Sequence, residues 1–130
     1  MQSGQHRSSA RANSIDEPRE ESERKRIQRD QVLRDQAWIG DAVLTLYARL
    51  KILREDGSLD GEKAVRMSSN QFLAALGEPT AVEAAIGRVY GHAGLDPAFA
   101  HIKAAIMPLF EKQEEKRLRK AHPRTSPKVG

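Results

Sequence analysis

Apolar residues recur at helical spacing in four stretches of the central sequence, and no stretch shows the strict alternation of a half-buried strand. The four stretches are residues 31–54, 61–76, 79–92 and 96–110. Each places leucine, isoleucine, valine or aromatic side chains three or four positions apart, so that they share one face of a helix. The pattern therefore predicts an all-α fold with four helices.

The first stretch holds the most regular apolar series of the chain. Its members recur every three or four positions: Trp38, Ala42, Leu46, Leu50 and Leu53. Gly40 interrupts this stretch, although a glycine inside a helix costs about 1 kcal/mol. We expect that Gly40 either starts the helix or lets another backbone approach closely.

Glycine, proline and aspartate mark the expected helix ends. Gly57 suits the C-terminal cap of the first helix, and Asp60 suits the N-terminal cap of the second. Pro79 fits the first turn of the third helix, where a missing amide costs nothing. Residues 91–94 are expected to form a turn, and Pro108 is expected to kink the last helix.

The two ends of the chain are polar and charged. Residues 1–30 carry seven basic and six acidic residues, and residues 111–130 carry seven basic and three acidic residues. The formal net charge of +4 therefore comes mainly from the C-terminal end. We expect a disordered or partly helical arm over 1–30, a helical domain over 31–112 and a disordered basic tail over 113–130. A basic tail suits a polyanionic partner, or it is simply a solvated end.

Several classes of protein are disfavoured by composition. The chain has no cysteine, which excludes disulfides, thiolate zinc sites and cysteine nucleophiles. No apolar run approaches the roughly 20 residues that a membrane-spanning helix needs. No apolar segment follows the N-terminal basic residues as it would in a signal peptide. We therefore expect a cytoplasmic protein with no membrane partner.

Two carboxylates stand apart because they lie in apolar surroundings. Asp41 lies within Trp-Ile-Gly-Asp-Ala-Val-Leu, and Glu83 lies within Ala-Val-Glu-Ala-Ala-Ile-Gly. A carboxylate in an apolar setting is usually paired, protonated or bound to a cation. The small residues beside each, among them Gly40 and Gly87, would let two helices approach and bring the carboxylates together.

Converging carboxylates are ligands of the kind that Mg²⁺ prefers, and a metal held there can activate water and stabilise charge on a phosphate. Two plainer interpretations stay open. In one, Asp41 pairs with an arginine such as Arg34 or Arg88. In the other, the polar edge of each helix simply faces water.

Four motifs, in order, resemble the ribonuclease III family. Trp-Ile-Gly-Asp-Ala-Val-Leu at 38–44 resembles its Phe-Leu-Gly-Asp-Ala-Val-Leu signature, and Ser-Asn-Gln-Phe-Leu at 69–73 resembles its Ser-Asn-x-x-Leu element. Val-Glu-Ala-Ala-Ile-Gly-Arg-Val-Tyr at 82–90 resembles its Phe-Glu-Ala-Leu-Ile-Gly-Ala-Ile-Tyr segment, and Gly-Leu at 94–95 resembles its closing motif. The resemblance covers roughly residues 31–112, and its first and third motifs are specific.

The resemblance implies a compact ribonuclease III-type helical domain that works as a homodimer. It implies a magnesium-dependent endonuclease that hydrolyses double-stranded or structured RNA and leaves 5′-phosphate and 3′-hydroxyl ends, with Mn²⁺ able to replace Mg²⁺. Asp41 and Glu83 match the essential acids of the family and would be catalytic residues and metal ligands. Asn70 matches a family asparagine that we interpret as structural.

Two positions depart from the family pattern. Ala37 stands where the family usually has a glutamate, and Thr80 stands where it usually has an aspartate. Similar small or hydroxyl residues occur in the Mini-III subgroup, which this chain resembles in size and which the resemblance links to processing of ribosomal precursors. Thr80 would then hold a water on the metal. The alternative is a catalytically inactive module that binds structured RNA or a ribonucleoprotein, and a weaker third hypothesis is a helical adaptor with no RNA role.

Contacts to RNA are expected outside the two acids. We expect the protein to lack the family's double-stranded-RNA-binding domain after the last helix, and we expect basic residues to compensate through phosphate contacts. The candidates are Arg88, Lys116, Arg117, Arg119 and Lys120, with Arg124 and Lys128 further along. We interpret Trp38 as core or dimer-interface packing rather than as a residue that stacks on RNA. His92 and His101 lack metal-ligand spacing, and we expect them at helix ends or on the surface.

Overall fold

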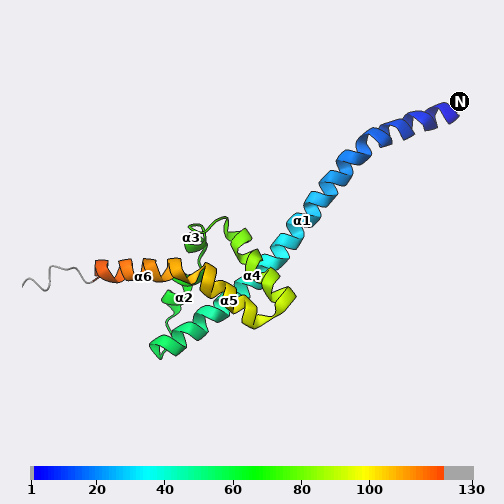
Figure 1. Ribbon diagram of the computed structural model, residues 1–130. Helices are drawn as coiled ribbons and strands as arrows, with labels where there is room; N and C mark the ends of the chain where they lie inside the picture. The colour runs from blue at the N-terminus through cyan, green and yellow to red at the C-terminus, as the bar shows by residue number, and fades with distance from the viewer. Residues whose placement is uncertain (1, 122–130) are drawn as a thin grey trace, which may run out of the picture. The chain divides into compact units, whose positions relative to one another are not determined.

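The computed structural model describes residues 2–121, with side chains from Arg19 onward (Figure 1). No strand occurs within this part of the chain, so the prediction of an all-α fold is confirmed. Nor is any helix there long and apolar enough to cross a membrane. The described helices are α1 (Gln2–Asp56), α2 (Gly61–Ser68), α3 (Asn70–Leu73), α4 (Pro79–Ala93), α5 (Leu95–Ala105) and α6 (Met107–Ala121).

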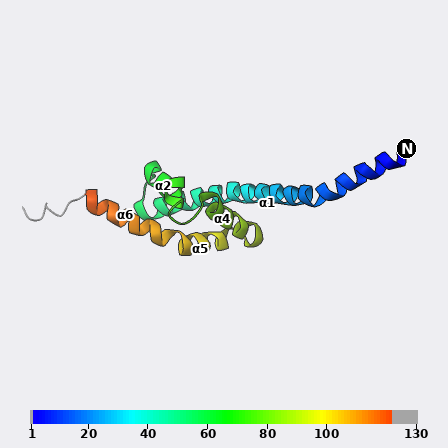
Figure 2. The ribbon, with the colours of Figure 1, turned by 90° about the horizontal axis from the view of Figure 1, so that it is seen from above.

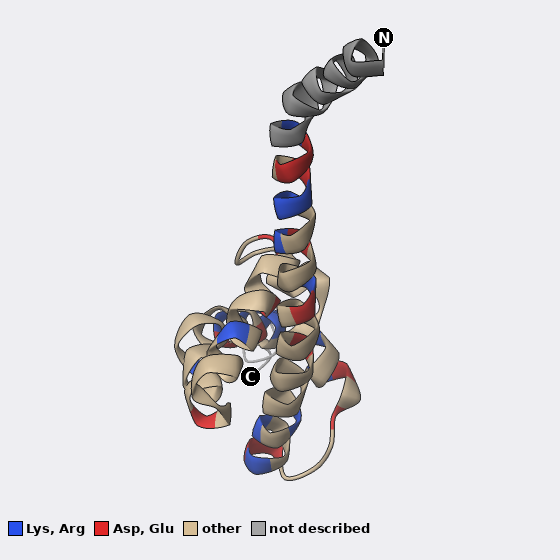
Figure 3. Cartoon of the chain, turned by 90° about the vertical axis from the view of Figure 1, so that its right-hand side faces the viewer, with Lys and Arg blue, Asp and Glu red and all other residues tan. Residues whose placement is uncertain are grey.

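The chain divides into two units, Met1–Arg34 and Asp35–Gly130, and α1 contributes to both. Residues 1–30 were expected to be disordered or partly helical, and the structure makes them helical from Gln2 onward. From Arg19 to Arg34 its side chains are exposed apart from Leu33, and basic and acidic residues alternate along it (Figure 3). Residues 122–130, the end of the expected tail, lie outside the described part of the chain.

The second unit is built around the part of α1 that begins at Asp35. Helices α2 to α6 gather around this part of α1 (Figures 1 and 2). Every one of these helices buries at least one apolar side chain in a shared core, as amphipathic helices must in order to leave water. The core residues are Val43, Leu44, Tyr47, Ala48, Ile52, Met67, Phe72, Leu73, Ile86, Ala98, Ile102, Ile106, Met107 and Phe110.

Three expected helix ends are confirmed. Gly57 follows α1 with φ 78°, a conformation that glycine adopts without strain. The Asp60 side chain caps α2 by accepting a hydrogen bond from the backbone amide of Lys63 at 3.0 Å. Pro79 is the first residue of α4, and the side chain of Glu78 caps that helix.

The expected single helix over 61–76 is wrong, because the chain divides it at Ser69. This residue is extended, with φ −73° and ψ 153°, and it separates α2 from the short helix α3. Its hydroxyl accepts a hydrogen bond from the backbone amide of Phe72 at 3.1 Å. Serine favours this capping geometry over a helix interior, so a new helix begins here and both pieces still reach the core.

The last expected helix is also divided, and it is longer than expected. Ile106, with φ −116°, separates α5 from α6. Pro108 is the second residue of α6 and supplies no amide, so the interruption at Ile106, which stays in the αR region, agrees with the expected kink. Helix α6 continues to Ala121, through residues expected to belong to the tail. The expected turn at 91–94 shrinks to Gly94, which has φ 95°.

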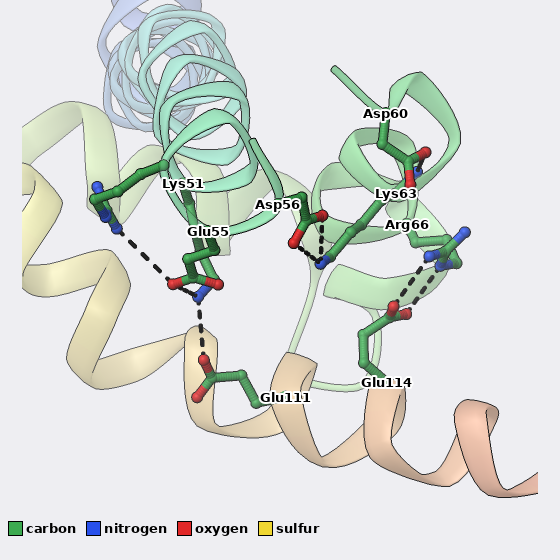
Figure 4. A network of polar contacts seen from close by, with 9 residues as sticks. Lys51, Glu55, Asp56, Asp60, Lys63, Arg66, Glu111 and Glu114 are labelled. Atoms are coloured by element: carbon green, nitrogen blue, oxygen red, sulfur yellow. Dashed lines mark hydrogen bonds and ion pairs between the residues drawn. The ribbon is translucent and has the colours of Figure 1, made fainter. Parts of the chain in front are cut away.

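A buried lysine joins α1 to α6. The Lys51 side chain is 7% exposed, and its Nζ donates to Glu55 Oε2 at 2.6 Å and to Glu111 Oε2 at 3.1 Å (Figure 4). Burial lowers the pKa of Lys51, but its hydrogen bonds to the two carboxylates outweigh burial and raise that pKa above its usual value. A buried ammonium is tolerated here because both partners reach it.

An arginine joins α2 to α6. Arg66 donates to both carboxylate oxygens of Glu114, from Nε at 2.8 Å and from Nη2 at 2.9 Å (Figure 4). Such paired contacts are stronger and more directional than a single surface ion pair. They hold the middle of α6 against α2.

Candidate active site

Helices α1 and α4 touch backbone to backbone at two glycines. A Cβ atom added to Gly40 would lie 1.7 Å from the carbonyl oxygen of Glu83, and one added to Gly87 would lie 1.9 Å from that of Gln36. Neither position has room for any side chain. The expectation of a close backbone approach at Gly40 is therefore confirmed, and Gly87 is its partner on α4.

This crossing brings Asp41 and Glu83 together. Asp41 directly follows the glycine that lies on the backbone of Glu83, and its side chain is close enough to raise the pKa of the Glu83 carboxyl. Asp41 is exposed, whereas Glu83 is half-buried. The sequence-based expectation that small residues let these carboxylates converge agrees with this geometry.

Glu83 holds a proton far more tightly than an ordinary glutamate. Burial, the hydrogen bond to Asp41 and the negative charges of Asp41 and Glu78 raise its pKa from 4.5 to about 7. Near neutral pH the Glu83 carboxyl is therefore partly protonated. A cation that binds between the two would displace this proton.

Glu78 is a third carboxylate whose influence sequence reasoning missed. Its side chain caps α4 by accepting hydrogen bonds from the backbone amides of Thr80 at 2.9 Å and Ala81 at 3.2 Å. Its charge also raises the pKa of Glu83. One signal was available in the sequence, because a glutamate directly before a helix-starting proline occupies the capping position.

Ala37 and Thr80 are the two positions at which the sequence departs from the ribonuclease III pattern that it resembles. Each lies one helical turn before one of the paired acids, Asp41 and Glu83. Ala37 is buried, at 6% exposure, on α1 before Asp41. Thr80 is half-buried on α4 before Glu83. Among the side chains described, Asp41 forms no ion pair with Arg34 or Arg88, so the plainer interpretation of an arginine partner is wrong.

The paired carboxyl groups fit a magnesium ion in their chemistry. Both present hard oxygen ligands, and the negative charge of Asp41, which helps raise the pKa of Glu83, would attract a cation. Within residues 19–121 no group of three or more His, Cys, Asp or Glu side chains is arranged to hold a metal. A Mg²⁺ held by Asp41 and Glu83 would therefore keep mostly water ligands, as Mg²⁺ commonly does.

Trp38 was expected to pack in the core or in a dimer interface, and the structure shows that it lies outside the core. It is 78% exposed, and the regular apolar series that it begins faces away from the helices that α1 packs against. Leu59, just before α2, and Val65, on α2, extend this apolar surface and line a groove with Leu53. We call this set the apolar face of α1 and α2: Trp38, Ile39, Leu46, Leu50, Leu53, Leu59 and Val65.

The expected RNA-contacting residues Arg88, Lys116, Arg117, Arg119 and Lys120 are exposed, but they lie on two helices, and Arg124 and Lys128 lie outside the described residues. Arg88 lies on α4, one residue beyond Gly87. The other four lie along α6: Lys116, Arg117, Arg119 and Lys120. His92 is exposed near the end of α4 and His101 is half-buried on α5, and neither belongs to a group of three or more metal-ligating side chains among the described residues.

Comparisons of this chain with protein families, with curated proteins and with solved structures found no match.

The raised pKa of Glu83 predicts how stability depends on pH. Because the pKa of Glu83 is raised on folding, the folded chain binds an extra proton between about pH 4.5 and 7 and loses this contribution as pH rises through 7. The quantity to compare is the melting temperature of Glu83→Gln minus that of wild type. In metal-free buffer this difference should be a few degrees larger at pH 8 than at pH 5. Thermal melts at each pH measure this difference.

Glu62→Gln is the matched control, because Glu62 is exposed on α2. Its melting temperature should follow wild type across the same pH range. A Glu83→Gln variant whose melting temperature also runs parallel to wild type would contradict the raised pKa of Glu83.

Proposed function

We propose that this chain is a magnesium-dependent endoribonuclease with a ribonuclease III-type helical domain. It would cleave double-stranded or structured RNA and leave 5′-phosphate and 3′-hydroxyl ends, and processing of ribosomal precursors is one such role. The single observation that carries the proposal is the convergence of Asp41 and Glu83 across the glycine crossing. These are the two acids that the sequence motifs single out.

Each part of the site has a role in this proposal. Asp41 and Glu83 bind Mg²⁺ or Mn²⁺, and when bound the metal supplies activation of water and neutralisation of charge on the phosphate. Gly40 and Gly87 hold the two acids at a fixed separation, because their backbones are in contact. Thr80, one turn before Glu83, presents a hydroxyl to water at the same edge of α4. Glu83 releases its proton near neutral pH, which makes metal binding tighter as pH rises.

The direct test is cleavage of a long RNA duplex by the full chain. With Mg²⁺ at low salt, wild type should shorten the duplex, and end-labelling should find 5′-phosphate and 3′-hydroxyl termini. Without a divalent metal it should not cut. If wild type leaves the duplex intact over a range of Mg²⁺ and Mn²⁺ concentrations, the catalytic proposal is abandoned.

A second candidate function is an inactive module that binds structured RNA. Ala37 and Thr80 favour it, since neither supplies a carboxylate. So does the absence, among the residues described with side chains, of a third metal-ligating group beside Asp41 and Glu83. Duplex binding that survives Glu83→Ala without any cleavage by wild type would support this alternative.

A homodimer is part of the proposal, and the apolar face of α1 and α2 supports it. Seven large apolar side chains that are 40–83% exposed are more than isolated surface residues. Trp38→Asp would place a charge in this face, so we expect the dissociation constant of the dimer to increase by at least ~100-fold. Sedimentation equilibrium over a concentration series measures the change.

Leu118→Asp is the matched control, because Leu118 is 53% exposed but lies on α6, outside the face. It should dimerise as wild type does. If wild type sediments as a monomer at every concentration, or if Trp38→Asp still dimerises normally, the apolar face is not the dimer interface.

A further inference from the structure

Helix α6 separates its charges by face. Of its three acids, Glu111 and Glu114 lie on the side that packs on the core, where they bind Lys51 and Arg66. Each is therefore paired with a cation from α1 or α2, although Lys51 is shared between Glu111 and Glu55 (Figure 4). The sequence alone shows a mixed-charge helix, whereas the structure leaves mostly cations on the side that faces solvent.

Three lysines form a row on that solvent side. Lys112, Lys116 and Lys120 are exposed and four residues apart, so the row rises about 6 Å per step along the helix. None of the three forms an ion pair with any side chain described in residues 19–121. Arg119 lies beside the row and binds Glu115 at 2.7 Å.

Arg117 does not belong to this row. It lines a hollow between α3 and α6 together with Arg66 and Glu114, and its charge helps lower the pKa of Glu114. Arg117 therefore lies on another side of α6 than the three lysines. Of the four basic residues that the sequence grouped together, Lys116 and Lys120 belong to the row, Arg119 pairs with Glu115, and Arg117 lines the hollow.

We infer that the lysine row Lys112, Lys116 and Lys120 binds the sugar–phosphate backbone of duplex RNA. The choice of RNA among polyanions rests on the proposed function, but the binding itself needs neither metal nor cleavage. Lysine ammonium groups are point charges that bind phosphates without reading bases, and an RNA duplex is recognised mainly by shape and backbone. No aromatic residue lies in α6 beyond Phe110, so base stacking on this row is excluded.

A membrane surface fits the row less well. A helix that lies on a membrane needs a free apolar face beside its basic one. Here Met107 and Phe110 are buried in the core, and Leu118 is the large apolar side chain that α6 leaves exposed. The charge on the row therefore favours a polyanion in water.

The test compares two triple variants of equal net charge. Lys112→Gln/Lys116→Gln/Lys120→Gln removes the row, and Arg24→Gln/Arg29→Gln/Lys103→Gln removes three other exposed cations. Fluorescence anisotropy measures binding of a labelled RNA duplex in EDTA, over a series of salt concentrations. Each phosphate contact adds about one unit to the slope of log affinity against log salt concentration. The row variant should therefore lose about 2 to 3 units of this slope and bind at least ~10-fold more weakly at low salt.

The control triple should keep the wild-type slope within about one unit. The inference is overturned if both triples weaken binding equally, if the row variant binds as wild type does, or if wild type does not bind the duplex at all. It is also overturned if wild type binds phosphatidylserine vesicles more tightly than the duplex. Binding is measured without a divalent metal, so it does not depend on cleavage. A chain that binds through the row in EDTA but does not cleave RNA with Mg²⁺ would refute the proposed catalysis and leave this inference standing.

Discussion

Gly40→Ala and Gly87→Ala should each destabilise the folded chain by more than about 4 kcal/mol, which for a small domain amounts to unfolding. The new methyl group would lie 1.7 Å from the carbonyl oxygen of Glu83 in one case and 1.9 Å from that of Gln36 in the other. Both obstacles are backbone atoms inside helices, so they cannot rotate away as a side chain could. The helices would have to separate, and the core between them would lose its contacts. Urea unfolding followed by circular dichroism measures the loss.

Gly91→Ala is the control on the same helix. Nothing lies within 4 Å of a Cβ added at Gly91, and the residue is exposed in the last turn of α4. Alanine should therefore stabilise the chain by about 0.5 kcal/mol through helix propensity. If Gly40→Ala unfolds at the same urea concentration as wild type, the close crossing of α1 and α4 is wrong.

Removal of either paired carboxylate should abolish RNA cleavage. Glu83→Gln and Asp41→Asn keep the size and hydrogen-bonding capacity of each side chain but remove the negative charge that a metal needs. We expect each to lower the cleavage rate by at least ~10³-fold with Mg²⁺. The double variant should be no slower than the worse single variant, because the two groups act as one unit. Single-turnover cleavage of an RNA duplex measures the rates.

Asp96→Asn is the matched control, since Asp96 is exposed in the first turn of α5. It should cleave at the wild-type rate. Duplex binding in EDTA should be unchanged in all of these variants, which separates catalysis from binding by the lysine row. A Glu83→Gln variant that still cuts within tenfold of wild type would refute the proposed role of Glu83.

Much of the local structure could be predicted from the sequence because it depends on neighbours in the chain. Helical spacing of apolar residues predicted the all-α class. Asp60 and Pro79 predicted helix starts, and Gly57 predicted a helix end, since caps are made from residues two or three positions away. The division at Ser69 was not predicted, because the apolar spacing continues through it, although the serine cap that starts α3 is a local signal. The interruption at Ile106 lies two residues before Pro108, where a kink was expected.

The candidate site was predicted in part. Asp41 and Glu83 were recognisable as carboxylates in apolar surroundings, and the glycines beside them predicted a close approach. The raised pKa of Glu83 and the contribution of Glu78 were not predictable, because they depend on which carboxyl groups face one another across α1 and α4. The sequence also could not show which acids of α6 pair with cations from other helices. Glu111 and Glu114 differ from Glu115 only in the residues that lie opposite them in the fold.

The sequence by itself determined that this protein is helical, where α2 and α4 begin, and which two acids lie among apolar residues along the chain. Only the tertiary structure decided which of the two apolar sides of α1 is buried. The side that includes Leu44, Ala48 and Ile52 packs in the core, whereas the more regular series that begins at Trp38 does not. Periodicity shows that a face is apolar, but burial depends on which face other helices can reach. That is decided by Gly40 and Gly87, because α4 can touch α1 only where both backbones are bare.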